Sequence, residues 1–191
     1  MPHKRKPWTI ESSKHIIQDR WVSIRADTCR SERDLEISPY YIFEYSPWVC
    51  IFPLTEDGKL LITEQYRHGI GQVLFEFPGG GVDSSDSSPL EAARRELLEE
   101  TGYTASEFIE LGDPSTDPAK NTNRLHFYLA KDARKIAEQQ LETTEDISLD
   151  LIEIEEVFSL MDRGLFLSAR QMGGLLLLLR YLNLPIPPQR Q

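Results

Sequence analysis

The stretch that decides the fold is VLFEFPGGGVDSSDSSPLEAARRELLEETGY, which runs from Val73 to Tyr103. Its first residues, 73–77, are aliphatic and aromatic apart from one glutamate, and they predict a β-strand that the following proline and glycines end. Ser88 and Glu91 then form a Ser-x-x-Glu capping box, and the proline after Ser88 suits the first turn of a helix. The stretch therefore predicts a strand, a glycine-rich loop and a helix from about residue 89 to 101 in direct succession.

Three carboxylates crowd one face of this predicted helix. Residues three and four positions apart share a helix face, so Glu96, Glu99 and Glu100 point the same way. They repel one another, and they stand in the C-terminal half, where the helix dipole disfavours negative charge by about 0.3–1 kcal/mol. Arg95 lies on the flank of the stripe and offsets only part of this cost. A divalent cation such as Mg²⁺ would neutralise the stripe, because it prefers oxygen ligands and commonly shares carboxylates with substrate phosphates.

The glycines before the helix extend this hypothesis. Gly79, Gly80 and Gly81 have no side chains, so a backbone carbonyl is able to reach a metal and backbone amides are able to approach a phosphate closely. The alternative interpretation is a solvated acidic helix face after a flexible turn. The flanking glycines and Arg95 favour the metal site.

The segment Gly80–Tyr103, which ends in Arg-Glu-Leu-Leu-Glu-Glu-Thr-Gly-Tyr, resembles the signature box of the Nudix hydrolases. The resemblance implies the α/β class, with a Nudix-type α/β/α sandwich and a mixed sheet. It also implies a metal site made chiefly by Glu96, Glu99 and Glu100, with the carbonyl of Gly80 as a weaker ligand. The expected cofactor is Mg²⁺, with Mn²⁺ as an expected substitute.

The front of the box departs from the family pattern, which is glycine, five residues, glutamate, seven residues and arginine. Counting from Gly80 leads to Asp86, but one residue too many then precedes Arg95. Counting back from Arg95 leads to Gly81 and Ser87. Either the loop carries one extra residue and aspartate replaces the first glutamate, or serine replaces it.

Two further segments, Glu64–His68 and Leu74–Gly80, are similar to the ADP-ribose and nucleoside-diphosphate-sugar pyrophosphatase branch of the family. Arg67 is the candidate diphosphate clamp, because a guanidinium binds phosphate in a forked geometry; the alternative is a surface arginine after a strand. Glu76 either contacts substrate or metal, or is an edge-strand glutamate without a site role. Gly81 is the third candidate substrate-binding residue.

The resemblance also implies a catalytic base in a late acidic loop, here residues 141–147. Glu145 is the first candidate and Glu142 the second, beside Glu100 of the helix as a catalytic residue. An ordinary acidic turn is the alternative. His68 is interpreted as exposed or packed on a strand, and Trp48 as a core residue or a base-stacking one.

The 191 residues suffice for one domain with a small extension. Residues 1–45 are expected to form a small N-terminal antiparallel sheet, which in this branch often helps to form a homodimer that binds the substrate base across its interface. Residues 46–184 are expected to form the Nudix domain, and residues 185–191 a loose tail. The pattern further predicts a hairpin of Trp48–Leu54 and Leu60–Tyr66, strands at 124–130 and 147–154, and helices at 155–163 and 166–182.

The charge and composition of the chain limit the kinds of binding partner and the cellular location that we expect. The chain has 21 basic and 31 acidic side chains, and its formal net charge of -10 disfavours nonspecific binding to nucleic acid or an anionic membrane. The chain opens without a secretory pattern, and the apolar run Leu175–Leu179 is far shorter than the ~20 residues that span a bilayer. Cys29 and Cys50 fit free thiols in a reducing cytosol, so a cytoplasmic location is expected.

The expected function is Mg²⁺-dependent hydrolysis of the diphosphate of a nucleoside diphosphate sugar, of the ADP-ribose, ADP-glucose or GDP-mannose type. The products would be a nucleoside monophosphate and a sugar phosphate. Two alternatives are a Nudix hydrolase of dinucleoside polyphosphates or other nucleotides, and a noncatalytic module that senses a nucleotide.

Overall fold

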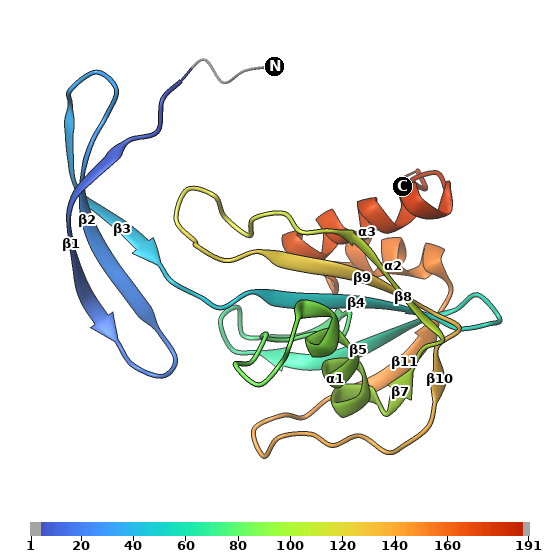
Figure 1. The fold of residues 1–191 in the computed structure, drawn as a ribbon. Helices are drawn as coiled ribbons and strands as arrows, with labels where there is room; N and C mark the ends of the chain where they lie inside the picture. Colours follow the sequence, from blue (N-terminus) through green and yellow to red (C-terminus); the bar gives the residue numbers. More distant parts are fainter. Residues whose placement is uncertain (1–4, 189–191) are drawn as a thin grey trace. The chain divides into compact units, whose positions relative to one another are not determined.

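The computed structural model describes residues 5–188, which divide into two units (Figure 1). One unit consists of the chain up to Ser46 together with Ser115–Arg124, and the other of Pro47–Pro114 and the chain from Leu125 onward. The strands are β1 (Thr9–Gln18), β2 (Ser23–Arg30), β3 (Glu36–Phe43), β4 (Trp48–Leu54), β5 (Leu60–Arg67), β6 (Gln72–Glu76), β7 (Tyr103–Thr104), β8 (Glu107–Gly112), β9 (Leu125–Lys131), β10 (Arg134–Lys135) and β11 (Ser148–Ile152). The helices are α1 (Pro89–Thr101), α2 (Ile154–Asp162) and α3 (Ala169–Leu182).

The first unit is a three-stranded antiparallel sheet in the order β1-β2-β3, so the expected small N-terminal sheet is confirmed. A charged group sits inside it: the buried Asp27 carboxylate accepts hydrogen bonds from Ser13 Oγ at 2.6 Å and Arg25 Nε at 3.1 Å. The segment 115–124 belongs to this unit because the amide of Phe43 donates to the carbonyl of Lys120 at 2.8 Å.

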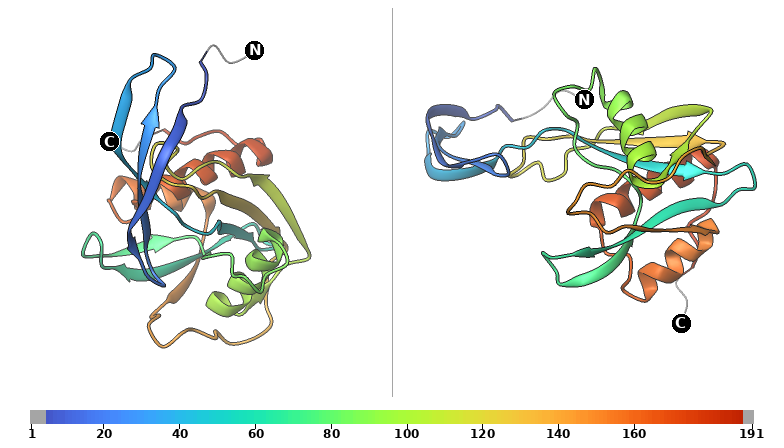
Figure 2. Two further views of the ribbon diagram at one scale, coloured as in Figure 1. Left: turned by 60° about the vertical axis from the view of Figure 1, so that its left-hand side comes forward. Right: turned by 90° about the horizontal axis from the view of Figure 1, so that it is seen from below.

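The second unit is built on a mixed sheet in the order β11-β5-β4-β9-β8, with β6 paired to β5 (Figure 2). Strands β4 and β9 run parallel, in the register Trp48↔Leu125, and the other pairs are antiparallel. Helix α1 covers one face of this sheet, and α2 and α3 cover the other (Figure 2). The expected α/β class with a mixed sheet between helical layers is confirmed.

Strand β4 shows why both faces are covered. Side chains alternate along a strand, so Val49 and Ile51 pack with α1, whereas Cys50 and Phe52 pack with α2 and α3. All four are buried, as expected for a central strand between two helical layers. On the α3 side the contact is close: a Cβ on Gly174 would lie 2.3 Å from the ring of Phe127.

The predicted hairpin of β4 and β5 is only partly correct. The two strands pair at Leu54↔Leu60, beside their turn, and then separate. The glycine-rich loop fills the gap, because the amides of Val49 and Ile51 donate to the carbonyls of Gly80 and Pro78, each at 2.9 Å. The loop before α1 is therefore held as part of the sheet rather than as a free turn.

Two predicted boundaries move for local reasons. The predicted helix 166–182 begins at Ala169, because Ser168 caps it by accepting a hydrogen bond from the amide of Gln171 at 3.4 Å. The predicted strand 147–154 is shorter, because Ile154 already opens α2. In the predicted tail, residues 185–188 have no helix or strand, and 189–191 lie outside the described residues, as do 1–4. Within residues 5–188, no helix is long and apolar enough to cross a membrane.

Candidate functional site

Helix α1 brings two of its glutamates against the glycine-rich loop. Its N-terminal cap is as predicted, with Ser88 accepting from the amide of Glu91 at 3.3 Å, and Gly102 closes the helix at a φ of 72°. Glu100 is 6% exposed, and its carboxylate accepts a hydrogen bond from the amide of Gly79 at 2.8 Å.

Glu96 approaches the same loop one residue later. A Cβ on Gly80 would lie 2.5 Å from Glu96 Oε1, so the loop and the helix are in contact only because glycine has no side chain. The three-residue and four-residue spacing thus places both carboxylates at one backbone segment.

Burial makes these two carboxylates hard to ionise. Desolvation raises the pKa of Glu96 to about 7, although the charge of Arg95 opposes the shift. Desolvation also raises the pKa of Glu100 to about 8, although the amide of Gly79 opposes it. The charge of Glu145 raises the pKa of both groups further, which puts this member of the acidic loop within electrostatic reach of the pair.

Arg95 organises the outer side of the stripe. Its Nη1 donates to Glu96 Oε1 at 2.9 Å and to Glu99 Oε2 at 3.0 Å, so the arginine neutralises two of the three glutamates rather than only flanking them. Its Nη2 donates to the carbonyl of Gly81 at 3.0 Å and to Asp86 Oδ2 at 2.9 Å. The arginine thereby ties the helix to the glycine-rich loop.

The same contacts bear on the altered front of the box. The Arg95 guanidinium lowers the pKa of the Asp86 carboxyl, whose Oδ1 also accepts from Arg95 Nε at 3.1 Å. This geometry supports the reading in which the loop has one extra residue and Asp86 takes the place of the first glutamate. Ser87 is the less favoured alternative.

The donor chemistry at α1 fits a hard divalent cation. Among the residues that the structure describes, no three His, Cys, Asp or Glu side chains are already arranged to hold a metal ion. Glu99 is bonded to Arg95, and Glu100 to the amide of Gly79. Two desolvated carboxylates are nevertheless placed together, and a bound cation would favour their ionised form. The Gly80 carbonyl accepts from Val49 and retains a second lone pair.

The two candidate bases lie in an exposed turn. The amide of Glu142 donates to Glu145 Oε2 at 2.9 Å, and the amide of Glu145 donates to the carbonyl of Glu142 at 3.0 Å. Glu145 is the one whose charge acts on Glu96 and Glu100, which favours it over Glu142.

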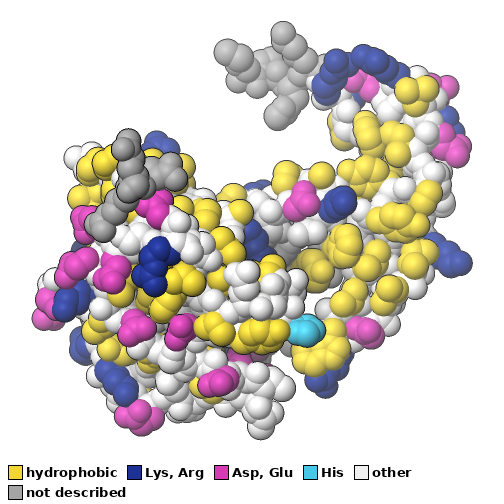
Figure 3. Space-filling model, turned by 180° about the vertical axis from the view of Figure 1, so that it is seen from behind, with side chains coloured by type: hydrophobic (Ala, Val, Ile, Leu, Met, Phe, Trp, Pro, Cys, Tyr) yellow, Lys and Arg dark blue, Asp and Glu magenta, His cyan; other side chains and the backbone are white. Residues whose placement is uncertain are grey.

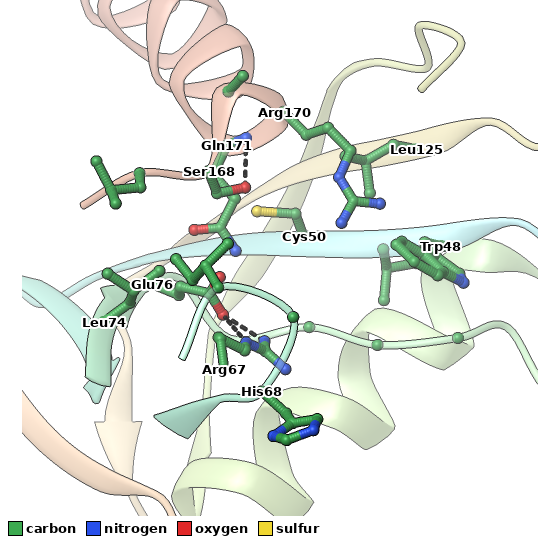
Figure 4. A pocket seen from close by; sticks show the side chains of 18 residues that line it. Trp48, Cys50, Arg67, His68, Leu74, Glu76, Leu125, Ser168, Arg170 and Gln171 are labelled. Carbon is green, nitrogen blue, oxygen red and sulfur yellow. Dashed lines mark hydrogen bonds and ion pairs between the residues drawn. The ribbon is translucent and has the colours of Figure 1, made fainter. Parts of the chain in front are cut away.

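A cavity of about 850 Å³ adjoins the glycine-rich loop (Figure 4). Its walls come from β4, the end of β5, β6, the loop itself and the first turn of α3. All three predicted substrate-binding residues, Arg67, Glu76 and Gly81, line it, together with Gly80. The structure therefore brings together side chains that the sequence places on separate elements.

Arg67 and Glu76 form an ion pair in the cavity wall. Arg67 Nε donates to Glu76 Oε2 at 2.8 Å, and Arg67 Nη2 contacts the same oxygen (Figure 4). The Glu76 side chain is 8% exposed, whereas that of Arg67 is 46% exposed. The Glu76 carboxylate is therefore buried against Arg67, and its charge offsets that of the proposed clamp.

Sequence reasoning missed the contribution of α3 to this cavity. Ser168, Arg170 and Gln171 line it, and the guanidinium of Arg170 lies 4.4 Å from the ring centroid of Trp48. Gln171 accepts from the amide of Phe77 at 2.8 Å and donates to its carbonyl at 3.1 Å. The helix itself was predicted, but only the fold brings its start to the end of β6.

Comparison with known proteins agrees with this geometry. The family description "NUDIX domain" matches residues 44–171. The ADP-ribose pyrophosphatase of Bacillus subtilis (strain 168) is 29% identical over 106 residues, and the match covers 56% of this chain and only 56% of that relative. An uncharacterized Nudix hydrolase of Schizosaccharomyces pombe is 33% identical over 197 residues, covering 89% of this chain and 92% of the relative. A crystal structure of an ADP compounds hydrolase has the same fold, with a TM-score of 0.83, 21% identity and coverage of 95% of this chain and 97% of that one.

Proposed function

The chain belongs to the Nudix hydrolase family, and from that premise we propose that it hydrolyses the diphosphate of a nucleoside diphosphate sugar with the help of Mg²⁺. ADP-ribose is the leading substrate, followed by ADP-glucose and GDP-mannose, and Mn²⁺ is expected to replace Mg²⁺. The name of the Bacillus subtilis relative supports this choice. The observation that carries the proposal is the placement of the buried Glu100 and the partly buried Glu96 carboxylates against a glycine-rich loop that also lines a cavity.

The metal-binding residues in this proposal are Glu96, Glu99, Glu100 and the carbonyl of Gly80. When bound, a divalent cation neutralises phosphate oxygens and lowers the pKa of a bound water. Glu100 and Glu96 are preorganised for that task, because the Gly79 amide holds the Glu100 carboxylate and Arg95 holds that of Glu96 before any ligand arrives.

The chain itself supplies the proton acceptor and the orienting groups. Glu145 is proposed to take the proton of the attacking water, with Glu142 as the second candidate. Arg67 is proposed to orient the diphosphate from the cavity wall, while Glu76 holds its guanidinium in place. Gly81 lets the substrate approach the backbone closely.

The homodimer is also part of the proposal, with the sheet of residues 1–45 as the dimerisation element. Apolar side chains lie exposed along this sheet (Figure 3), among them Trp8 at 49%, Ile10 at 55% and Trp21 at 72%. Exposed apolar side chains that lie near one another are typical of a surface that a partner covers. Size measurement by light scattering tests this assignment, and a monomer at working concentration would contradict it.

The enzymatic proposal is tested with a substrate panel in the presence of Mg²⁺. We expect the highest kcat/KM for ADP-ribose or another nucleoside diphosphate sugar, with both products identified by phosphorus NMR. A preference for dinucleoside polyphosphates would support the first alternative. Nucleotide binding without turnover of any member would support the noncatalytic sensing module.

A further inference from the structure

The acidic loop, residues 141–147, carries both candidate bases on its exposed part. It lies between β10 and β11, and the chain passes the C-terminal end of α1 just before it (Figure 1). Its residues 142–146 are all exposed, so their position does not depend on burial in the core. The hydrogen bonds between Glu142 and Glu145 stabilise the turn but do not connect it to α1. What holds the loop near the metal site is therefore to be found at its ends.

One side-chain amide, that of Gln139, joins both ends of the acidic loop to α1. Gln139 Nε2 donates to the carbonyl of Glu100, near the end of α1, at 2.7 Å. The same nitrogen donates to the carbonyl of Ile147, the last residue of the loop, at 3.1 Å. A carboxamide nitrogen has two N–H groups, so these two bonds use its whole donor capacity. The loop is thereby closed where it begins and ends.

The elements on both sides of this amide are themselves fixed. The last carbonyls of a helix lack partners inside the helix, and the amide of Gln140 donates to one of them, that of Glu99, at 2.8 Å. At the far end, Ile147 is 5% exposed, and β11 begins directly after it, paired with β5 from Ser148 onward. The Gln139 amide therefore connects the end of α1 to the start of β11.

This connection bears on the two groups that the proposed function brings together. Glu100 accepts the bond from Gln139 through its carbonyl and the bond from the Gly79 amide through its carboxylate. Capping of α1 explains the bond to Glu100 but not the second bond, to Ile147. Closing a loop at its base removes many of its conformations, so the exposed stretch with Glu145 remains near α1.

We propose that Gln139 is a positioning residue, which closes the acidic loop and thereby holds Glu145 toward the glutamates of α1. The assignment rests on the proposed function, in which Glu145 takes the proton of the attacking water. Gln139 does not touch the substrate in this assignment and acts through the loop alone. Its loss reduces the fraction of molecules whose base is in place, which lowers kcat without weakening substrate binding.

The first measurement is opening of the loop, followed by limited proteolysis of the full chain with a glutamate-specific protease. Mass spectrometry gives the rates of cleavage after Glu142 and Glu145. In Gln139→Ala we expect cleavage there about 10-fold faster than in the wild type, the range that one or two hydrogen bonds contribute. Gln139→Glu keeps the size of the side chain, but an ionised carboxylate donates no hydrogen bond, so it should open the loop as well. Gln140→Ala is the matched control, because it shortens an exposed neighbouring side chain and keeps the backbone bond; it should be cleaved like the wild type.

The second measurement is steady-state kinetics with Mg²⁺ and the best substrate of the panel. Gln139→Ala should lower kcat about 10-fold and leave KM within about twofold of the wild type, with Gln140→Ala unchanged. In the Glu145→Gln background, Gln139→Ala should change kcat by less than about twofold, because the base that it positions is absent. A purely structural role of Gln139 would lower kcat equally in both backgrounds. Circular dichroism confirms that each variant is folded.

Three results overturn the assignment. They are unchanged cleavage of the loop in Gln139→Ala, a raised KM without loss of kcat, and the same loss of kcat with and without the Glu145 carboxylate. A different result separates this assignment from the proposed function. If the wild type hydrolyses no substrate while Gln139→Ala still accelerates cleavage, the proposed function fails and the closure of the loop by Gln139 stands.

Discussion

Replacing Glu100 by glutamine tests whether ionisation of its buried carboxyl destabilises the metal-free protein and whether a bound cation removes this destabilisation. Burial raises the pKa of this group from its ordinary value of 4.5 to about 8, so the metal-free folded state retains a proton that the unfolded chain releases. The wild type therefore loses stability as the pH rises from about 4.5 toward 8, and the loss is complete above pH 8. Glutamine carries no charge and escapes this loss.

The magnitude follows from the two pKa values. The difference, 8 − 4.5 = 3.5 units, corresponds to about 5 kcal/mol at 1.36 kcal/mol per unit. Weakening of the hydrogen bond from the Gly79 amide costs the variant about 1 kcal/mol. We therefore expect the free energy of unfolding of Glu100→Gln to exceed that of the wild type by a few kcal/mol at pH 8 and to be slightly lower than it at pH 4.5.

Urea denaturation at pH 4.5, 6 and 8 with EDTA measures these differences. Glu91→Gln on the same helix, where the side chain is 52% exposed, is the control and should follow the wild type. Addition of Mg²⁺ at pH 8 should stabilise the wild type and not Glu100→Gln, because binding to the folded state alone stabilises it. Parallel pH profiles for the wild type and Glu100→Gln would refute the reasoning.

The remaining predictions concern the packing of α3, the proposed catalytic base and the contacts of Arg95. Gly174→Ala should lower the free energy of unfolding by about 1–3 kcal/mol, because its Cβ would lie 2.3 Å from the Phe127 ring. Gly173→Ala, the control next to it, meets nothing within 4 Å and should raise the free energy of unfolding by about 0.5–1 kcal/mol. Equal urea midpoints for the two variants would contradict this. Steady-state kinetics should show that Glu145→Gln lowers kcat about 10²- to 10⁴-fold, whereas Glu142→Gln changes kcat little. A larger loss of kcat in Glu142→Gln than in Glu145→Gln would make Glu142 the base. Asp86→Ala should raise the Mg²⁺ requirement for turnover, because it frees the arginine that aligns the α1 carboxylates; an unchanged Mg²⁺ dependence would leave Asp86 without a role in the site.

The sequence by itself determined α1, its two caps and its stripe of glutamates. These features depend on residues no more than four positions apart, so capping and helical periodicity are visible without the fold. Most strands of the mixed sheet were predicted for the same reason, since alternation along β4 is local, but β8 was not predicted. The acidic stripe is unfavourable for an isolated helix, because its glutamates repel one another, and this cost was the signal that predicted a metal site.

Only the tertiary structure decided how these pieces meet. The separation of β4 from β5 depends on the loop that enters between them, and the hydrogen bonds of Arg95 to Asp86 depend on how that loop lies against α1. The approach of Arg170 to Trp48 joins residues more than one hundred positions apart. Such contacts follow from the packing of α3 across the sheet. No short-range pattern in the sequence encodes this packing, because the free energy that fixes it is spread over the whole buried core.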